Sequence, residues 1–191
     1  MYDKVKVNVE NRIIVLSDDI TEESVSVVSD AILGMLSEDG ANRTVLQTYK
    51  ERPIKLIINS FGGSVYDAMQ LIDIIENSTT PIKTFCFGKA MSAAFLIFLA
   101  GHYRYMSKNA TLMYHQVSQY VGGTCTQIEE DVEELSYTQD KIEKYVLSKS
   151  KISKKKLEEI KKYKQDWYIH SEEALKLGVA DNILDGKRRN L

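Results

Sequence analysis

Two strand–turn–helix units follow one another in the middle of the chain, and they constrain its fold more than any other feature. In the first unit, the apolar run 54–59 leads through a Gly-Gly turn at 62–63 into a helix with one apolar face. In the second, the apolar run 82–87 leads through a tight turn at 88–91 into a nearly all-apolar helix at 92–100. A helix between two strands carries the chain back across the sheet, so such strands run parallel. The sequence therefore predicts an α/β layered fold.

Shorter elements flank these two units. Residues 12–16 (RIIVL) predict a buried strand, and Thr21 is suited to cap a following helix that we expect to end near Leu36. Residues 37–53 are polar and end in proline, so we expect a long connection with room for a short element. The remaining expected elements are strands at 103–106 and 110–115, helices at 127–148 and 153–163, a helix at 172–177 capped by Ser171, a final segment at 179–184 without an assigned element, and a polar tail at 185–191.

The composition is that of an ordinary globular chain. Its 191 residues suit one domain spanning 1–191, and 25 Lys and Arg against 27 Asp and Glu leave a net charge of −2. This balance excludes a disordered chain and a basic surface that coats nucleic acid, so we expect no nucleic-acid partner. The longest apolar run has eight residues, whereas a membrane span needs about 20. Because the N-terminus has no apolar segment of a secretory signal, we expect a cytoplasmic protein without membrane attachment.

No residue pattern predicts a metal or an organic cofactor. Cys86 and Cys125 are too few for a disulfide framework and lack the CxxC spacing of zinc sites. No cluster of histidine, cysteine and carboxylate residues has ligand spacing. The ten lysines between Lys141 and Lys164 are interleaved with acidic residues, which favours a solvated helix surface over an anion-binding one.

Ser92 is the first candidate for chemistry, because it stands where a strand turns sharply into a helix. That position presents a hydroxyl at the carboxyl edge of the sheet, beside free N–H groups of the helix. A serine there often only caps its helix, and on this residue alone both interpretations stay open. Gly63 ends the neighbouring unit, and its backbone N–H and that of Ala93 could form an oxyanion hole. The alternative for Gly63 is a simple helix-opening turn.

Three histidines are available as a general base, and His115 is the best placed of them. It ends the apolar run ATLMYH. His102 follows a glycine in a turn and His170 precedes a helix cap, so each has a sufficient local explanation.

Two further residues complete the candidate chemistry. Asp166 is followed by two aromatic residues, so we expect it to be partly buried, and a buried carboxylate needs a partner such as an imidazole N–H. Lys89 lies close to Ser92 in the sequence, so a Ser-Lys dyad is an alternative to a Ser-His mechanism.

The joint order of these motifs resembles that of the proteolytic subunit of the Clp protease family. The Gly-Gly turn is followed by GKAMSAAF, MYHQ and QDWYIHSEEALKLGVAD, and the resemblance covers about residues 12–184. It implies a ClpP/crotonase-like layered fold with a protruding handle helix. It also implies that Ser92 is the nucleophile, His115 the general base and Asp166 the orienting acid, and that the turn after INS supplies part of the oxyanion hole.

The same resemblance implies an activity and partners. The family's subunits are serine endopeptidases that hydrolyse unfolded or partner-delivered polypeptides through an acyl-enzyme. They work inside a self-assembled homo-oligomer, a heptameric ring or a stacked double ring. A Gly-rich segment leads into the handle, which we place at about 117–150, with Gly122 and Gly123 in substrate binding. ATP-dependent unfoldases are partners in the family, but only about eleven residues precede the first strand here, which argues against such a partner.

Two other functions remain as alternatives. A crotonase-type acyl-CoA enzyme shares the fold and uses a similar oxyanion hole, but such enzymes generally employ carboxylates without a Ser-His pair. A non-catalytic ring or scaffold subunit would carry the same three residues without aligning them. The chain departs from the family pattern at Phe61 and Val117, where proline is usual, and at Ala93, where methionine commonly follows the serine. These departures alter loop rigidity and pocket shape but remove no catalytic group.

Overall fold

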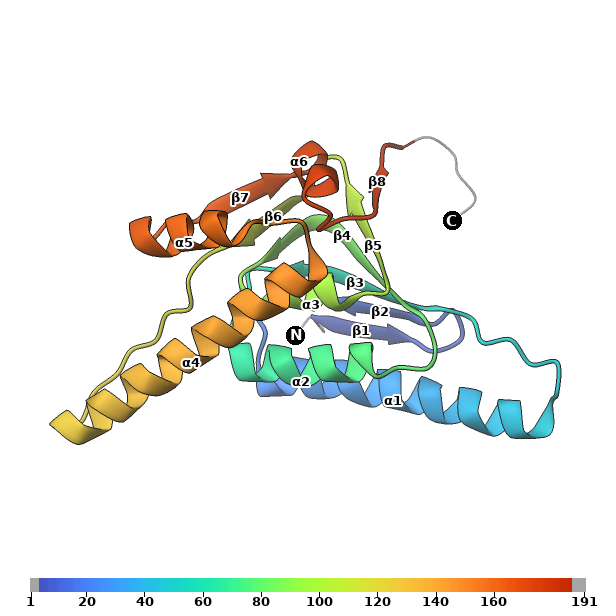
Figure 1. The fold of residues 1–191 in the computed structure, drawn as a ribbon. Coiled ribbons are helices and arrows are strands. Elements are labelled where there is room, and N and C mark those ends of the chain that lie inside the picture. Colours follow the sequence, from blue (N-terminus) through green and yellow to red (C-terminus); the bar gives the residue numbers. More distant parts are fainter. Residues whose placement is uncertain (1–3, 187–191) are drawn as a thin grey trace.

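The computed structural model describes residues 4–186, which form a mixed sheet with helices packed around it (Figure 1). The strands are β1 (Val5–Asn8), β2 (Ile13–Leu16), β3 (Ile54–Ser60), β4 (Ile82–Met91), β5 (Tyr103–Ser107), β6 (Thr111–Tyr114), β7 (Trp167–His170) and β8 (Asn182–Leu184). The helices are α1 (Glu22–Val45), α2 (Val65–Glu76), α3 (Ala93–Ala100), α4 (Cys125–Lys149), α5 (Lys154–Tyr163) and α6 (Ser171–Lys176). Residues 187–191 of the predicted polar tail lie outside the described residues.

Most of the sheet is parallel, as the strand–turn–helix units predict. Its order is β1-β2-β3-β4-β5-β8, with β6 beside β4 and β7 beside β6. Only β1 and β7 pair antiparallel to their neighbours among the described strands. The predicted α/β layered fold is therefore confirmed. The sequence did not predict β1, because its residues VKVN are mostly exposed at the edge of the sheet and carry little hydrophobic signal.

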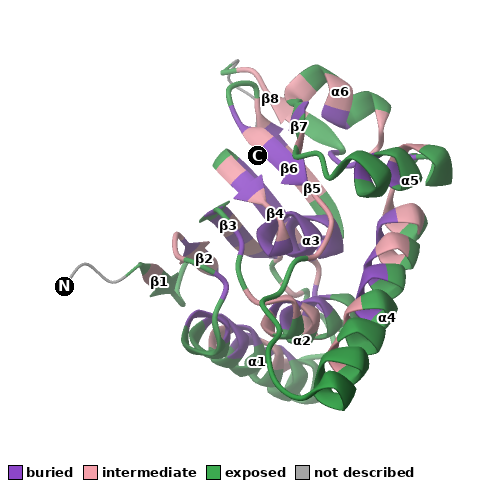
Figure 2. Ribbon diagram, turned by 90° about the vertical axis from the view of Figure 1, so that its left-hand side faces the viewer, coloured by how far each residue is buried: buried purple, intermediate pink, exposed green. Residues whose placement is uncertain are grey.

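The two predicted units are β3–α2 and β4–α3, and their helices supply much of the core. Every residue of α3 is buried, which explains its nearly all-apolar sequence. Helix α2 buries one stripe, made of Ala68, Leu71, Ile72 and Ile75. Helices α1, α2, α3 and α4 pack in chain order, each against the next, and Figure 2 shows the buried residues gathered at α3 and the strands beside it.

Strand β4 is longer than predicted and pairs with different strands along its two halves. The predicted tight turn at 88–91 is wrong, because these residues continue β4 after a register shift against β3. A glycine suits this shift, because a Cβ on Gly88 would lie 2.6 Å from Asn59 Oδ1 and the asparagine side chain would have to move. The first half of β4 pairs with β5 and its second half with β6. β4 therefore joins the main sheet to β6, the strand that His115 follows.

Helix α1 is also longer than predicted. It runs to Val45 instead of ending near Leu36, so much of the expected connection at 37–53 is helical. The polar residues of this stretch suggested a loop, but one of them, Asp39, is fully buried. A buried carboxylate is stable only with partners, so the explanation lies in its contacts.

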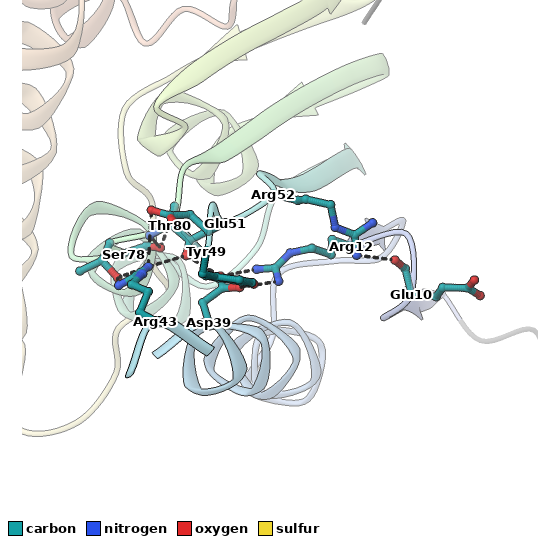
Figure 3. A network of polar contacts seen from close by, with 10 residues as sticks. Glu10, Arg12, Asp39, Arg43, Tyr49, Glu51, Arg52, Ser78 and Thr80 are labelled. Atoms are coloured by element: carbon teal, nitrogen blue, oxygen red, sulfur yellow. Dashed lines mark hydrogen bonds and ion pairs between the residues drawn. The ribbon is translucent and has the colours of Figure 1, made fainter. Parts of the chain in front are cut away.

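A cluster of hydrogen bonds around Asp39 fixes the second half of α1 (Figure 3). Arg12 donates two hydrogen bonds to this carboxylate, at 2.7 and 2.9 Å. The hydroxyls of Thr80 and Tyr49 each donate another at 2.6 Å. Burial alone would raise the pKa of Asp39, but the hydrogen bonds from these three residues hold its pKa below the ordinary value. Because Arg12 precedes β2 and Thr80 precedes β4, the cluster ties α1 to the starts of two strands.

The predicted handle is present as helix α4, which runs out from the body of the molecule (Figure 1). Its buried residues, Thr138, Gln139, Ile142 and Val146, all lie in its second half. Residues 117–124, the first part of the predicted handle, form neither helix nor strand. The predicted cap of the helix at 172–177 is wrong, because α6 begins at Ser171, whose hydroxyl donates to Lys108 O at 3.2 Å.

Replacing Asp39 with alanine should strongly destabilise the fold. The change leaves the buried Arg12 guanidinium without its counter-ion, and removal of one partner of a buried ion pair costs about 3–5 kcal/mol. Chemical denaturation measures this loss. Glu38, an exposed acid on the same helix, gives the matched control, because Glu38→Ala should change the free energy of unfolding by less than about 0.5 kcal/mol. Equal effects of the two substitutions would contradict the role of Asp39.

The same carboxylate should make stability depend on pH. The pKa of Asp39 is lower in the folded chain than in the unfolded chain, where an aspartate has a pKa of about 3.9. Its stabilising contribution is therefore complete above that pH and is lost as the pH falls through the lower, folded-state pKa. Thermal unfolding at a series of pH values below about 5 should show a steeper loss of stability for the wild type than for Asp39→Asn. Parallel curves would rule this contribution out.

Candidate active site

The register between β4 and β6 brings Ser92 and His115 together. The two strands are parallel, and Met91 pairs with Met113. Ser92 follows β4 and donates its backbone N–H to Met113 O at 2.9 Å, while His115 follows β6. Both residues therefore stand at the carboxyl ends of neighbouring strands, the edge where open α/β sheets bind ligands. Ser92 Oγ and His115 Nε2 lie 2.7 Å apart, a hydrogen-bond distance.

Asp166 reaches the same place from the other side of β6. Strand β7 is antiparallel to β6, and Tyr114 pairs with Trp167. The next positions outward are His115, just after β6, and Asp166, just before β7. His115 Nδ1 and Asp166 Oδ1 lie 3.4 Å apart. The Asp166 side chain is 54% exposed, more than its aromatic neighbours suggested, because β7 is an edge strand.

Ser92 has a strained backbone and does not cap its helix. Its φ of 53° and ψ of −124° lie in a region that costs a residue other than glycine about 1–3 kcal/mol. The side chain forms no capping hydrogen bond, and its hydroxyl pairs with His115 instead. The interpretation of Ser92 as a simple cap is therefore wrong. A sharp, strained strand-to-helix turn is the arrangement that exposes the nucleophile in α/β-hydrolases.

The turn before α2 has no room for side chains at Gly62 and Gly63. Their φ angles of 110° and 148° also favour glycine. A Cβ on Gly62 would lie 2.7 Å from both Met91 O and Ser92 Cβ. A Cβ on Gly63 would overlap the backbone of Ile20. The two glycines therefore let the end of β3 touch the Ser92 turn on one side and the Ile20 segment on the other.

The N–H groups of Gly63 and Ala93 donate no hydrogen bond to any group within residues 4–186. The Ile20 N–H donates to Gly62 O and the Ser64 N–H donates to Ile20 O, both at 2.8 Å. Gly63 lies between these two residues, so its own N–H points away from Ile20. Ala93 is the first residue of α3, where an N–H has no partner inside the helix. Both residues line the cavity beside Ser92. The two predicted oxyanion donors are thus free and near the hydroxyl.

A cavity of about 220 Å³ opens beside Ser92. Gly63, Ala93 and His115 line it together with the serine. The rest of its lining is mostly apolar and comprises Val65, Leu96, Tyr114, Val117, Ser118 and Ile142. The sequence did not predict these residues, because they come from four separate segments of the chain. The one available signal was their place on the apolar faces of α2, α3 and α4.

A second hollow of about 350 Å³ adjoins the first along helix α4. It shares Gly63, Val65, Val117 and Ser118 with the first cavity and extends to Tyr66 and Leu135. The two hollows are therefore adjacent.

The competing candidates for chemistry have other partners. His102 Nδ1 accepts the backbone N–H of Ile82 at 3.0 Å, so this imidazole supports β4. His170 stands at the N-cap of α6. Lys89 Nζ lies over the Phe61 ring, 4.0 Å from its centroid, and Ser92 Oγ has a hydrogen bond only with His115 among the described residues. These contacts argue against a Ser-Lys dyad.

Gly122 and Gly123 lie in the irregular segment before α4. They are not among the residues that line the cavity beside Ser92. Gly123 has a φ of 154° and packs closely against Gln127, which takes part in the capping box of α4. A role of the two glycines in substrate binding stays a prediction.

Residues 4–186 also bear on metal binding and on membrane insertion. No group of three or more His, Cys, Asp and Glu side chains there is arranged to hold a metal ion. None of the described helices combines the length and apolar character needed to span a membrane.

The sequence of this chain is similar to those of known proteins. A model of the family described as Clp protease matches residues 1–187. The protein named ATP-dependent Clp protease proteolytic subunit from Deinococcus radiodurans is 29% identical over 142 residues, which cover 73% of this chain and 69% of that protein. The predicted resemblance is confirmed, and with it a peptidase function at the level of the family. This chain belongs to the Clp protease family.

Proposed function

We propose that this chain is a serine endopeptidase that hydrolyses polypeptides through an acyl-enzyme. The observation that carries the proposal is the 2.7 Å distance between Ser92 Oγ and His115 Nε2, with His115 Nδ1 facing Asp166. A general base must lie within hydrogen-bond reach of the proton that it removes, and this pair meets that requirement. Ser92 is then the nucleophile, His115 the general base and Asp166 the group that orients the imidazole.

In the first half of the reaction, Ser92 Oγ attacks the carbonyl carbon of the scissile peptide while its proton passes to His115 Nε2. The carbonyl oxygen becomes negative, and the free N–H groups of Gly63 and Ala93 stabilise it. One such donor is worth about 2.7–4 kcal/mol of transition-state stabilisation. Asp166 stabilises the positive imidazolium that forms at the same time.

In the second half, His115 gives its proton to the nitrogen of the leaving amine, and the C–N bond breaks. The acyl group stays on Ser92 as an ester. A water molecule then loses a proton to His115 and its oxygen attacks the ester carbon. The bond from Ser92 Oγ to the acyl carbon breaks, His115 returns the proton to Oγ, and the carboxylic acid is released.

The lining of the cavity beside Ser92 favours substrates that have an apolar side chain at the cleavage site. Its walls away from the reacting groups are mostly apolar, and the adjoining hollow along α4 leaves space for further residues of an extended substrate. A crotonase-type acyl-CoA enzyme needs no Ser-His pair, so the contact between Ser92 and His115 favours the peptidase.

Assembly into a homo-oligomer is part of the proposal. The Clp protease family implies oligomeric assembly. Three apolar side chains of the protruding helix α4 support it here: Ile128 is 37%, Val132 50% and Tyr137 67% exposed. The assembly is a heptameric ring or a stacked double ring, which native mass spectrometry distinguishes by mass. The short N-terminal segment argued against an ATPase partner, but the relative's name, ATP-dependent Clp protease proteolytic subunit, favours one, and we include it in the proposal. A cytoplasmic location stays a prediction.

Labelling with a fluorophosphonate tests the nucleophile. We expect a covalent adduct on Ser92 in the assembled protein and none in Ser92→Ala, with native mass spectrometry reporting assembly in both. Hydrolysis of an unstructured peptide should fall by about 10⁴–10⁶-fold in Ser92→Ala. Ser26→Ala, at an exposed position on α1, should leave both readouts unchanged. Assembled wild type that neither hydrolyses peptide nor takes up the label would favour the non-catalytic scaffold.

Replacing Gly62 with alanine should impair catalysis. The new Cβ would lie 2.7 Å from Ser92 Cβ, so the nucleophile has to move. A displacement of about 1 Å in an active site can cost about 100-fold in rate, and kcat/KM should fall by that order. Gly34→Ala is the matched control, because Gly34 lies in α1 with no atom within 4 Å of an added Cβ. It should leave kcat/KM unchanged, and an equal loss in both variants would refute the steric explanation.

A further inference from the structure

One buried amide, that of Gln139, binds the chain on both sides of His115. Gln139 lies in the inner half of α4 and is only 3% exposed. Its Oε1 accepts the backbone N–H of Val117 at 2.9 Å. Its Nε2 donates to the Tyr114 hydroxyl at 3.3 Å and to Glu143 Oε1 at 2.7 Å. Both ends of the amide are therefore engaged, and buried networks of this kind fix the groups that they join.

The contacts of Gln139 matter because the chain leaves regular structure at His115. Strand β6 ends at Tyr114, and residues 115–124 form neither helix nor strand. The ladder hydrogen bonds that hold a strand are therefore missing where the imidazole needs support. The hydrogen bond to Val117 supplies an anchor two residues after His115, and the one to Tyr114 supplies an anchor one residue before it.

Tyr114 also contacts the helix that follows Ser92. Its ring meets that of Phe95 edge-on, with centroids 6.2 Å apart, and Phe95 lies in the first turn of α3, the helix that follows Ser92. Burial raises the pKa of Tyr114 to about 12, so its hydroxyl stays neutral and can accept the hydrogen bond from Gln139. The connected side chains of Gln139, Tyr114 and Phe95 therefore lie next to both the proposed base and the proposed nucleophile in the chain.

The same network reaches the segment that carries Asp166. Glu143, the third partner of Gln139, lies 3.7 Å from Lys161 Nζ on helix α5. Helix α5 ends at Tyr163, three residues before Asp166. Helix α4 therefore contacts the chain beside His115 and also the helix that precedes the Asp166 segment.

We infer that Gln139 is a positioning residue for His115, an inference that rests on the proposed peptidase function. Its amide holds the Tyr114 side chain by the hydroxyl and the Val117 backbone by its N–H, so that His115 Nε2 stays 2.7 Å from Ser92 Oγ. Gln139 does not line the cavity beside Ser92, so it acts through His115 and not on the substrate.

Steady-state kinetics of Gln139→Leu with a short peptide that has an apolar residue at the cleavage site tests the inference. Leucine has a similar volume but keeps none of the three hydrogen bonds. We expect kcat to fall by about 10–100-fold, because the imidazole loses its alignment, while KM changes by less than about threefold. Gln139→Glu keeps an oxygen that accepts the Val117 N–H, so its kcat should lie between those of the leucine variant and the wild type.

Val146→Ala is the matched control for a purely structural effect. Val146 is fully buried in the same inner half of α4 but has no hydrogen bond to residues 114–117. It should lower the melting temperature while kcat stays within about twofold of the wild type. Equal losses of kcat in Val146→Ala and Gln139→Leu would overturn the positioning role.

Fluorophosphonate labelling separates the failure of this inference from that of the proposed function. Wild type that takes up no label on Ser92 would refute the function itself. Wild type that is labelled, beside Gln139→Leu that folds and is labelled at the same rate, would refute only the role of Gln139. If Gln139→Leu does not fold, Gln139→Asn takes its place, since its amide is one methylene too short to reach all three partners. A wild-type kcat in Gln139→Asn would overturn the inference as well.

Discussion

The absence of side chains at Gly62 and Gly63 is the constraint on which the rest of the site depends. These residues bring the end of β3 into contact with the Ile20 backbone on one side and with the turn at Ser92 on the other. No larger residue fits either contact, and the positive φ angles add a second reason for glycine. The free N–H of Gly63 is a product of this packing, because its neighbours in the chain make the hydrogen bonds to Ile20.

Strand register then decides which side chains meet. Parallel pairing of β4 with β6 puts Ser92 beside His115, and antiparallel pairing of β6 with β7 puts Asp166 opposite His115. A shift of one residue in either pairing would turn one of these side chains to the other face of the sheet. The hydrogen bonds of Gln139 act around the end of β6, where its amide binds the Tyr114 hydroxyl and the Val117 N–H.

Much of this fold could be predicted from hydrophobic patterning. The strands at 54–60 and 82–91 and helices α2 and α3 have strong apolar signals, and their order implies parallel pairing. Patterning could not predict the second half of α1, because its anchor is a carboxylate that looks solvent-exposed until Arg12 and Thr80 meet it across the fold. The continuation of β4 past Gly88 was hidden for a related reason, since a glycine in a bulge and a glycine in a turn look alike in a sequence.

Helix α4 has an exposed outer half and an inner half that contacts the residues around His115. One unbroken series of hydrogen bonds, each from a residue to the fourth before it, joins the two halves into a single element. A neighbour that contacts the outer half therefore touches the same helix that binds the Val117 N–H. A displacement of the inner half of α4 would also move the backbone two residues after His115.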